Sequence, residues 1–443
     1  MKLHAFHATD GDCLLLESDA GRRVLIDGGR TSSFKACTQP TLDSLVTQKK
    51  ALDLVVVSHI DADHISGIIP LLDAVEKWES FKFQMSSPHN AGLRKPKVPE
   101  PPKIKGIWHN SWRRQLGKLA DPAGNLAQAV AVAVDIAFGD DRESVPKTAL
   151  SLADIAAGAE QGERLMNLID LARVPIPFNE PFGGMVKLRK PIHVEKFGAL
   201  KLSVLGPAQS HINKLRKDFE ELLKELPDAP GNGRRLPGPN GRIGQALAID
   251  GIPLDLAVEA SEQFIRDLTA KAEIIEKANA GIVTAPNRAS IILLAEERGR
   301  TCLLTGDAAV PEIIDGLKAA KLLDREPFRC NVLKVQHHGA EHNVSAEFTR
   351  RVLADNYVLC GDGASGNPNP SVVKTIIETR LEEDPETPFT LWFTTSATRP
   401  ASPKKQAVMK EAIGIAKVAE NKHDGMVTVN VLDDDEKVHT IDV

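Results

Sequence analysis

Four side chains that often bind metal ions fall within six positions of the sequence, directly after the apolar segment 54–57. They are His59, Asp61, Asp63 and His64. Neutral imidazole nitrogens and carboxylate oxygens suit Zn, Mn or Fe, and a ligand set this rich can hold two ions. Two such ions can activate a water molecule and stabilise both the attacking and the leaving oxygen of a phosphate or ester. A solvated polar turn is the weaker alternative, because polar turns rarely place two His and two Asp so closely.

Two further groups of the same kind occur more than two hundred positions downstream. They are Asp307 after the apolar segment 301–305, and His337 and His338 after the segment 331–336. Each apolar segment predicts a β-strand, and strands of one sheet end at one edge, so these side chains can converge. Alone, Asp307 is more often a helix cap and a His pair is more often part of a surface turn. Together, the three groups predict a site for two metal ions.

Strand and helix segments alternate around these residues, in the order expected of a layered α/β fold. Strands are predicted at 13–18, 22–27, 54–57, 104–108, 200–205, 289–294, 301–305, 331–336, 357–360, 426–431 and 438–443. Helices are predicted at about 41–50, 66–78, 123–173, 211–225, 257–278, 311–323, 346–354, 372–381 and 404–420.

The two strand-rich ends flank a more helical middle. This order predicts one domain over residues 1–443, with a core of about 1–80 and 285–443 and a mainly helical insertion at about 113–280. Two separate domains, one for each set of strands, are the alternative. No internal repeat is evident.

The composition limits the classes of function. The chain of 443 residues has a net charge of −5, so any contact with nucleic acid must come from local patches. Aromatic residues make up 4%, which argues against a base-stacking platform. The five Cys lie far apart without a C-x-x-C motif, which favours reduced thiols in a cytoplasmic protein. Neither a signal peptide nor an apolar run of membrane-spanning length is evident, so we expect no membrane segment.

Two segments carry local positive charge. Residues 88–118 are rich in Pro and contain eight Lys or Arg against one acid, Glu100. The segment 227–244 is rich in Gly and Pro, predicts a flexible stretch, and contains Arg234, Arg235 and Arg242. Both segments could bind phosphates. Ordinary solvated loops are an equally strong interpretation, because charge runs usually serve only solubility.

The sequence resembles the metallo-β-lactamase-fold hydrolases, and more narrowly it is similar to the nuclease-like domain of competence-associated DNA uptake proteins. The matching motifs are Gly11-Asp12-Cys13, Ile26-Asp27-Gly28-Gly29, Ser58 to Gly67, Asn287 to Ser290, Leu303 to Asp307, and Leu333 to Gly339. They cover roughly residues 1–80 and 285–365, and no motif covers the middle. The resemblance implies a four-layer αβ/βα sandwich with metal ions at one edge, between two sheets.

The resemblance also implies a ligand set for two divalent ions, Zn or Mn. His59 and Asp61 would bind one ion, Asp63 and His64 the other, Asp307 would bridge both, and His337 would complete the second site. The usual motif has His in place of Asp61, but the uptake-type branch commonly carries Asp, a harder ligand that favours Mn or Mg. Most family members add one more His from the middle of the chain. His109 is the candidate, and the alternative that His109 or Asn110 only lines the cleft is equally strong.

Further roles follow from the same resemblance. Asp63 is expected to hold the reacting water and its proton, while His338 and Lys334 would stabilise developing negative charge. For Lys334, a solvated strand residue is the somewhat stronger alternative. Asp12 and Asp27 are expected to form hydrogen bonds behind the ligands. Asn369 stands where the branch often has the His of a His-Pro pair, so Asn369 and Asn110 are candidate substrate contacts.

The resemblance favours phosphodiester substrates, with DNA or RNA first. A second hypothesis is hydrolysis of a small phosphodiester, lactone or thioester, with the helical insertion as a lid over the site. A third hypothesis is a scaffold or partner subunit that binds another protein through the insertion, for instance in defence against invading DNA. Complete ligand groups argue against a purely structural role.

Overall fold

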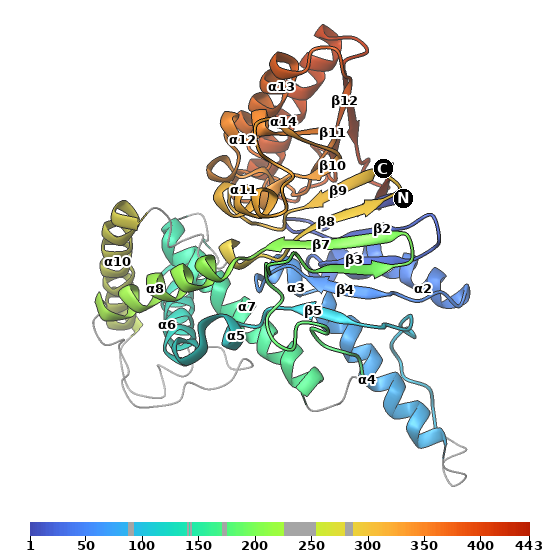
Figure 1. Ribbon diagram of the computed structural model, residues 1–443. Helices are drawn as coiled ribbons and strands as arrows, with labels where there is room; N and C mark the ends of the chain where they lie inside the picture. Colours follow the sequence, from blue (N-terminus) through green and yellow to red (C-terminus); the bar gives the residue numbers. More distant parts are fainter. Residues whose placement is uncertain (87–92, 140, 142–143, 171–174, 226–253, 280–286) are drawn as a thin grey trace.

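The computed structural model describes residues 1–86, 93–139, 141, 144–170, 175–225, 254–279 and 287–443 (Figure 1). The segment 227–244, predicted to be flexible, lies outside the described residues, as do its arginines Arg234, Arg235 and Arg242.

The first of two central sheets has six strands in the order β14-β1-β2-β3-β4-β5. They are β1 (Lys2–Phe6), β2 (Leu14–Glu17), β3 (Arg23–Ile26), β4 (Leu54–Val57), β5 (Ile107–His109) and β14 (Val438–Asp442). Strands β3, β4 and β5 are parallel, and Val57 at the end of β4 pairs with His109 at the end of β5. This register brings His109 level with the start of the 59–64 metal-ligand motif.

The second sheet has eight strands in the order β13-β12-β11-β10-β9-β8-β7-β6. They are β6 (Val194–Phe197), β7 (Leu200–Gly206), β8 (Ile292–Glu297), β9 (Arg300–Leu304), β10 (Phe328–Lys334), β11 (Val352–Leu359), β12 (Phe389–Phe393) and β13 (Val427–Val431). Strands β9 and β10 are parallel, and Leu304 pairs with Lys334. Asp307 and the His337-His338 pair therefore follow two neighbouring strand ends at one edge of this sheet.

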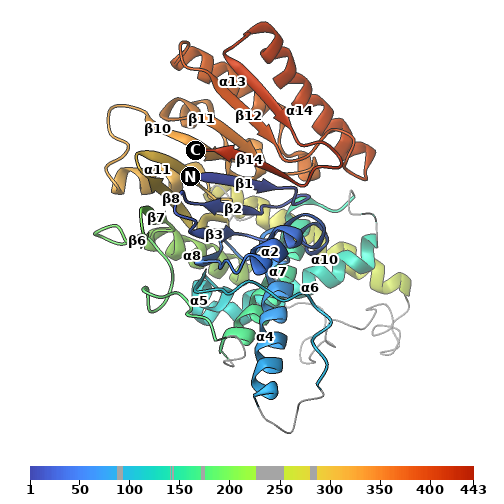
Figure 2. The same ribbon diagram turned by 90° about the vertical axis from the view of Figure 1, so that its right-hand side faces the viewer.

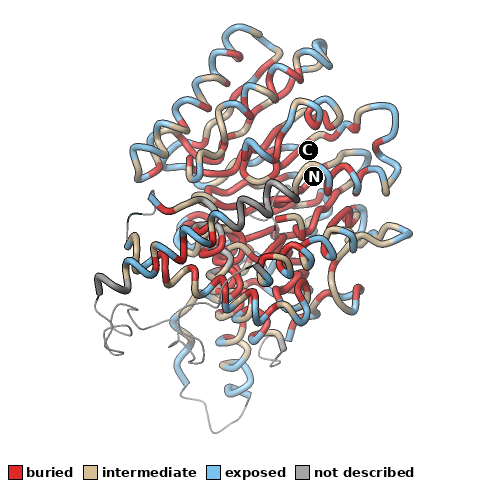
Figure 3. Tube along the Cα trace, turned by 90° about the vertical axis from the view of Figure 1, so that its left-hand side faces the viewer, coloured by how far each residue is buried: buried red, intermediate tan, exposed pale blue. Residues whose placement is uncertain are grey.

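The two sheets pack face to face, and helices cover their outer faces (Figure 1, Figure 2). In β4, Leu54 and Val56 face the other sheet, whereas Val55 and Val57 face the helices, as the two-residue alternation of a strand requires. The helices are α2 (Gln39–Thr47) and α4 (Ile68–Met85) on the first sheet, and α11 (Val310–Ala319), α12 (Ala346–Arg351), α13 (Pro370–Glu383) and α14 (Pro403–Lys422) on the second. Buried residues concentrate between these layers (Figure 3). The predicted four-layer αβ/βα sandwich is confirmed.

The middle of the chain forms a group of helices beside the sheets, at the left of Figure 1. Its members are α5 (Trp112–Leu116), α6 (Ala120–Phe138), α7 (Lys147–Asp170), α8 (Gln209–Glu225) and α10 (Leu254–Asn279). They share an apolar core that also includes Ile60 of the metal-ligand motif. Between α7 and α8 the chain contributes β6 and β7 to the second sheet, so the segment 113–280 holds two core strands as well as helices.

Helix α4 continues seven residues past its predicted end at Trp78, to Met85. The prediction ended at the last residue of the buried face, because the remaining turns are half-buried or exposed and have no apolar periodicity to reveal them. No helix within the described ranges is both long and apolar enough to cross a membrane.

Two glycines on one face of α7 provide a test of how the helical group contacts the metal-ligand motif. A methyl group at Gly158 would lie 2.4 Å from the carbonyl oxygen of Ile60, whereas a methyl group at Gly162 would have no atom within 4 Å. We expect Gly158→Ala to cost about 1–3 kcal/mol through overpacking. Gly162→Ala should stabilise the helix by about 0.5–1 kcal/mol. Chemical denaturation of the two variants checks this, and equal effects would contradict the close contact.

Candidate metal centre

The loop after β4 is fixed by hydrogen bonds to both sheets. The Asp27 carboxylate accepts from the backbone N–H and from the hydroxyl of Ser58, at 2.7 Å each. From the second sheet, the Ile291 N–H donates to the carbonyl of Ser58 at 2.8 Å. The short helix α3 (Ala62–Ile65) follows and carries Asp63 and His64. The metal-ligand motif is therefore held at the point where the sheets meet.

One compact group contains two imidazoles and two carboxylates. The Nε2 atoms of His64 and His338 lie 3.3 Å apart. The Oδ2 atom of Asp307 lies 3.4 Å from His64 Nε2 and 3.2 Å from His338 Nε2. The Oδ2 atom of Asp63 lies 3.6 Å and 3.1 Å from the same two nitrogens. Four ligands at about 2.0–2.1 Å from a tetrahedral ion would be separated by roughly 3.3–3.4 Å, so these residues fit a metal ion.

Two further carboxylates hold the imidazole rings from behind. Asp27 Oδ2 lies 2.9 Å from His64 Nδ1, and Asp12 Oδ1 lies 3.1 Å from His338 Nδ1. An Nδ1–H donor on each ring leaves the Nε2 lone pair directed into the group, as metal-binding His requires. Asp12 is also close to the group, but its oxygens face His338 Nδ1 and Lys334. Both carboxylates thus lie where hydrogen bonding behind the ligands was expected.

Lys334 is buried and lies between two of these carboxylates. Its side chain is 1% exposed, and its ammonium group donates to Asp12, to Asp307 Oδ1 at 3.4 Å and to the Gly306 carbonyl at 2.9 Å. The alternative of a solvated strand residue is therefore wrong. Burial disfavours the charge on Lys334, but Asp12 and Asp307 hold its pKa above the usual value.

The buried carboxylates require positive charge. Burial alone would raise the pKa of Asp307, yet His338, His64, His337 and Lys334 hold it well below the usual value. Conversely, burial alone would lower the pKa values of His64 and His338, but neighbouring carboxylates, Asp307 first, raise both well above the ordinary value. Protonated rings or a bound cation can meet this requirement.

A second group of potential ligands lies beside the first and approaches the same oxygen of Asp307. His59 Nε2 lies 3.7 Å from Asp307 Oδ2 and 3.6 Å from Asp61 Oδ2. Three buried polar atoms here have no hydrogen-bond partner: His59 Nε2, Asp61 Oδ1 and His109 Nε2. Burial lowers the pKa of His109 to about 4, so its ring is neutral near pH 7. Buried polar atoms are normally partnered, and these lone-pair donors fit a second cation.

The positions of His337 and His338 differ from those expected. His338 Nε2, not His337, lies with Asp63, His64 and Asp307. His337 is 25% exposed, its Nδ1 lies 3.0 Å from Asn343 Oδ1, and its Nε2 lies 3.8 Å from Asp307 Oδ2. Both His residues and Gly339 have positive φ angles, of 48°, 53° and 78°. This tight left-handed turn directs the His338 ring, and not the His337 ring, toward Asp63, His64 and Asp307.

Three further residues have contacts that differ from those predicted for them. Asn110 is fully buried, and its amide exchanges hydrogen bonds of 2.7 and 2.8 Å with the backbone of Val186. Asn369 caps α13 by accepting from the Ser371 N–H at 2.9 Å. Both side chains serve the fold in these contacts. Asp307 does not cap α11, whose N-cap is Ala309.

Sequence reasoning assigned no role to Ser58, Asn287 and Asn343. The Ser58 hydroxyl lies 3.0 Å from His59 Nδ1, and the Asn287 amide lies 3.3 Å from His337 Nε2. Asn343 contacts His337 Nδ1 and, through its amide, the Asp307 carbonyl at 3.4 Å. Ser58 and Asn287 belong to motifs that carry the family resemblance, and this membership could have pointed to their roles. Asn343 lies in a loop that contains no such motif.

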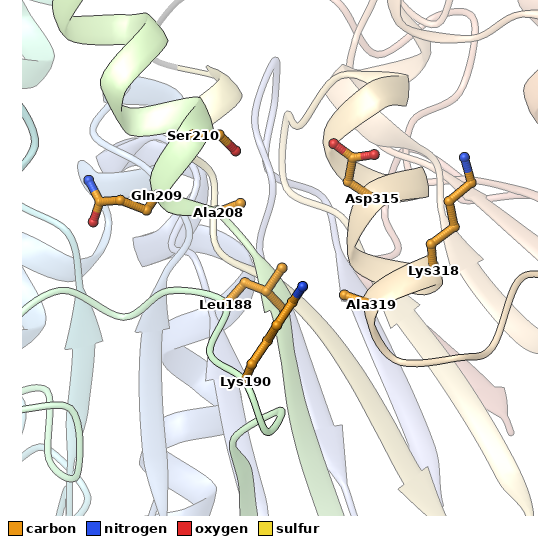
Figure 4. Close-up of a pocket in the computed structure, with 8 residues that line it drawn as sticks. All are labelled: Leu188, Lys190, Ala208, Gln209, Ser210, Asp315, Lys318 and Ala319. Carbon is orange, nitrogen blue, oxygen red and sulfur yellow. The ribbon is translucent and has the colours of Figure 1, made fainter.

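A surface pocket lies apart from this residue set. It has a volume of about 640 Å³ and lies between the start of α8 and α11 (Figure 4). Its lining includes Lys190, Gln209, Asp315 and Lys318, and none of the predicted site residues.

A family model described as the metallo-beta-lactamase superfamily matches residues 8–76. The two sheets and their helices are consistent with the fold of that superfamily. A search of curated proteins finds no match. The matched segment contains Asp12, Asp27 and the 59–64 motif, and the buried group of Asp and His residues completes the argument. Fold, match and residue set point to a metal-dependent hydrolase that binds a divalent ion. The narrower likeness to DNA uptake proteins stays a prediction.

The two adjacent histidines can be distinguished by metal binding. We expect His338→Ala to lower zinc affinity by more than the roughly 10–100-fold typical of losing a residue behind a ligand. His337→Ala, which removes a ring at the rim, should have a smaller effect. Competition with a chromophoric chelator measures both affinities. A larger loss in His337→Ala would restore the original assignment.

The charge on Lys334 can be tested by unfolding. Lys334→Met leaves Asp12 and Asp307 without their shared cation, which should cost about 3–5 kcal/mol when no metal is added. Lys201→Met is the matched control, because Lys201 pairs with Glu296 on the surface at 3.0 Å. It should change stability by less than about 1 kcal/mol. Chemical denaturation in the presence of chelator gives both values, and similar losses would refute the buried role of Lys334.

Proposed function

We propose that this protein is a metal-dependent phosphodiesterase that cleaves nucleic acid. The observation that carries the proposal is the position of Asp307, whose Oδ2 lies within 3.7 Å of His59 Nε2 and within 3.4 Å of His64 Nε2. One carboxylate therefore joins two groups of potential ligands. Bound there, two divalent ions would activate water and stabilise the negative charge that develops on a phosphate.

Three side chains of the protein have separate roles in the proposed reaction. Asp63 contributes Oδ2 to the first ligand group and is 18% exposed, so its carboxylate borders both the ligands and solvent. This position suits a group that holds a water molecule and accepts its proton. Lys334 has its three N–H donors directed at three protein oxygens, so it positions Asp12 and Asp307 and does not contact substrate. His338 acts as a ligand in this scheme.

The side chains that remain partly exposed to solvent show from which side the site can be reached. Asp61 is 22% exposed and His337 25%, whereas the His59 and His64 side chains are fully buried. Gly11 packs directly on Asp63, because a methyl group there would overlap the Asp63 carbonyl. The opening is therefore bordered by the loop 9–12 and the ends of the two ligand groups.

Two ion pairs lie beside this loop. Arg30 donates to both oxygens of Asp10, at 2.9 and 2.7 Å. Lys405 binds Asp362 at 3.0 Å, and it helps Arg30 to hold the pKa of Asp10 below its usual value against the effect of burial. Both cations are about one-third exposed. Each pair is neutral as a whole, so the preference for an anionic phosphodiester rests on the cations proposed for the metal centre.

Hydrolysis of a small substrate is the second candidate, because one observation favours it. Helix α7 packs on the Ile60 carbonyl through Gly158, so the helical group lies directly against the metal-ligand motif. Such a cover would admit a small ester more readily than a duplex. The scaffold hypothesis is weaker, because a purely structural role does not explain why buried polar atoms of His59, Asp61 and His109 have no hydrogen-bond partner.

The activity test uses three substrates in parallel: plasmid DNA, single-stranded RNA and bis-p-nitrophenyl phosphate. We expect cleavage with Mn or Zn, complete loss with chelator, and no activity in the double variant Asp63→Ala, His64→Ala. Asp315→Asn is the control, because that carboxylate is 58% exposed on α11 and should leave the rate unchanged.

The outcomes separate the hypotheses. Hydrolysis of the small phosphodiester without cleavage of DNA or RNA would support the small-substrate candidate. No hydrolysis, together with no metal in the purified protein, would leave the scaffold hypothesis. Activity that survives the double variant would place the chemistry elsewhere in the molecule.

A further inference from the structure

We infer that the edge of the first sheet opposite the metal centre is an anchoring surface for the phosphate backbone of nucleic acid. The basic edge, as we call this surface, comprises Lys49, Lys50, Lys95, Lys97, Lys103 and Lys105. All six side chains belong to exposed residues. The choice of ligand rests on the proposed function, and the inference adds a binding surface outside the site of chemistry.

The strand register places the basic edge away from the metal centre. Leu52 bridges to Ile104 just before β4 and β5, whereas Val57 pairs with His109 at the ends of these strands. The five steps from Leu52 to Val57 span about 17 Å at roughly 3.3 Å per residue. Of the basic stretch 88–118, Lys103 and Lys105 therefore lie at this far edge, because they flank Ile104. Arg113, Arg114 and Lys118 follow β5 on the metal side.

Backbone pairing joins cations from two distant segments. The Leu52 N–H donates to the Lys103 carbonyl at 2.9 Å, and the Lys105 N–H donates to the Leu52 carbonyl at 3.1 Å. Lys49 and Lys50 precede Leu52 in the turn after α2 and are exposed. Positive charge thus gathers here through the fold, which a solvated charge run in one loop would not produce.

Acidic side chains at this edge are already engaged. Asp53 is 7% exposed and accepts from Lys105 at 2.7 Å and from Arg22 at 3.3 Å. Glu100 and Glu79 lie 3.3 and 3.2 Å from the ammonium group of Lys82, which they share. Lys105 is engaged by Asp53, and the other five lysines of the basic edge give this surface an excess of exposed positive charge, although the whole chain carries a net charge of −5.

The shape of the basic edge suits a linear polyanion. Trp78 of α4 donates its indole N–H to the Val98 carbonyl at 3.1 Å, which holds the segment 93–105 along the helix. Figure 2 shows this segment running beside α4, which projects from the body of the protein. The ten steps from Lys95 to Lys105 can extend over up to roughly 33 Å. A single small anion would use only part of this length.

The outer end of α4 continues the surface with apolar groups. Of the six large hydrophobic residues that are exposed in the described chain, three lie here: Phe83 at 80%, Met85 at 40% and Leu93 at 40%. One exposed ring is not a stacking platform, but the Phe83 ring can stack on a single unpaired base. We therefore expect single-stranded nucleic acid to bind at least as well as duplex.

The test measures binding by fluorescence anisotropy with the full chain in chelator, so that nothing is cleaved. The probes are a labelled 20-nucleotide single strand and a 20-base-pair duplex. The variant Lys95→Gln, Lys97→Gln, Lys103→Gln should lose about 10-fold or more in affinity at low salt. The slope of log K against log salt should fall by about 2 to 3. The matched control replaces three exposed lysines elsewhere, Lys196→Gln, Lys321→Gln, Lys410→Gln, and should bind like the wild type.

Three results would overturn the inference. The first is that the wild-type protein binds neither probe. The second is that the two triple variants lose equal affinity for the probes. The third is that the lysine variant loses affinity only for an acidic polypeptide such as polyglutamate, which would indicate a protein partner. Hydrolysis of bis-p-nitrophenyl phosphate by the triple variant separates this inference from the proposed function. If that activity persists while neither probe binds the wild type, the anchoring surface fails and the phosphodiesterase stands.

Discussion

The buried negative charge of Asp307 is the constraint on which the site and its surroundings depend. A carboxylate that is 3% exposed costs several kcal/mol unless cations and hydrogen-bond donors surround it. Here the partners come from three places: His64 on the first sheet's loop, His338 after β10, and Lys334 at the end of that strand. Satisfying one charge therefore requires both sheets to end at the same point. A bound ion would relieve the same requirement.

The rigidity of the metal-ligand motif follows from contacts that are themselves buried. Asp27 binds Ser58 and His64, so one carboxylate fixes both the start of the loop and an imidazole ring. Close backbone contact at Gly28 and Gly67, where a methyl group at Gly67 would lie 2.1 Å from the Gly28 carbonyl, holds α3 against the end of β3. Small changes in this packing would move α3 and, with it, the side chains of Asp63 and His64.

The sandwich and most ligand groups were predictable from sequence, because each group directly follows an apolar strand. Strands β1, β6 and β12 were not predicted. In β1 the alternation of Lys2 and His4 with Leu3 and Ala5 is a strand signal, but the strand is only five residues long. Strand β6 is exposed or half-buried throughout. The choice between His337 and His338 depends on left-handed backbone angles, which adjacent identical residues do not reveal. The burial of Lys334 depends on Asp12 from the other sheet, a contact without any local signal.

The two ends of β4 have opposite electrostatic character, and this contrast follows from the parallel strands. The carboxyl end has three carboxylates close together, those of Asp61, Asp63 and Asp307, and their negative charges require cations. At the amino end, Asp53 forms ion pairs with Arg22 and Lys105, and further lysines remain exposed. On the proposal of an anchoring surface, a polyanion would be attracted to the second end and repelled by carboxylates at the first, unless ions are bound there. Because the two ends lie about 17 Å apart, the lysines and Asp63 would meet different phosphates of one polyanion. Metal loading would then decide whether the second phosphate can approach Asp63, so binding and chemistry would be separable steps.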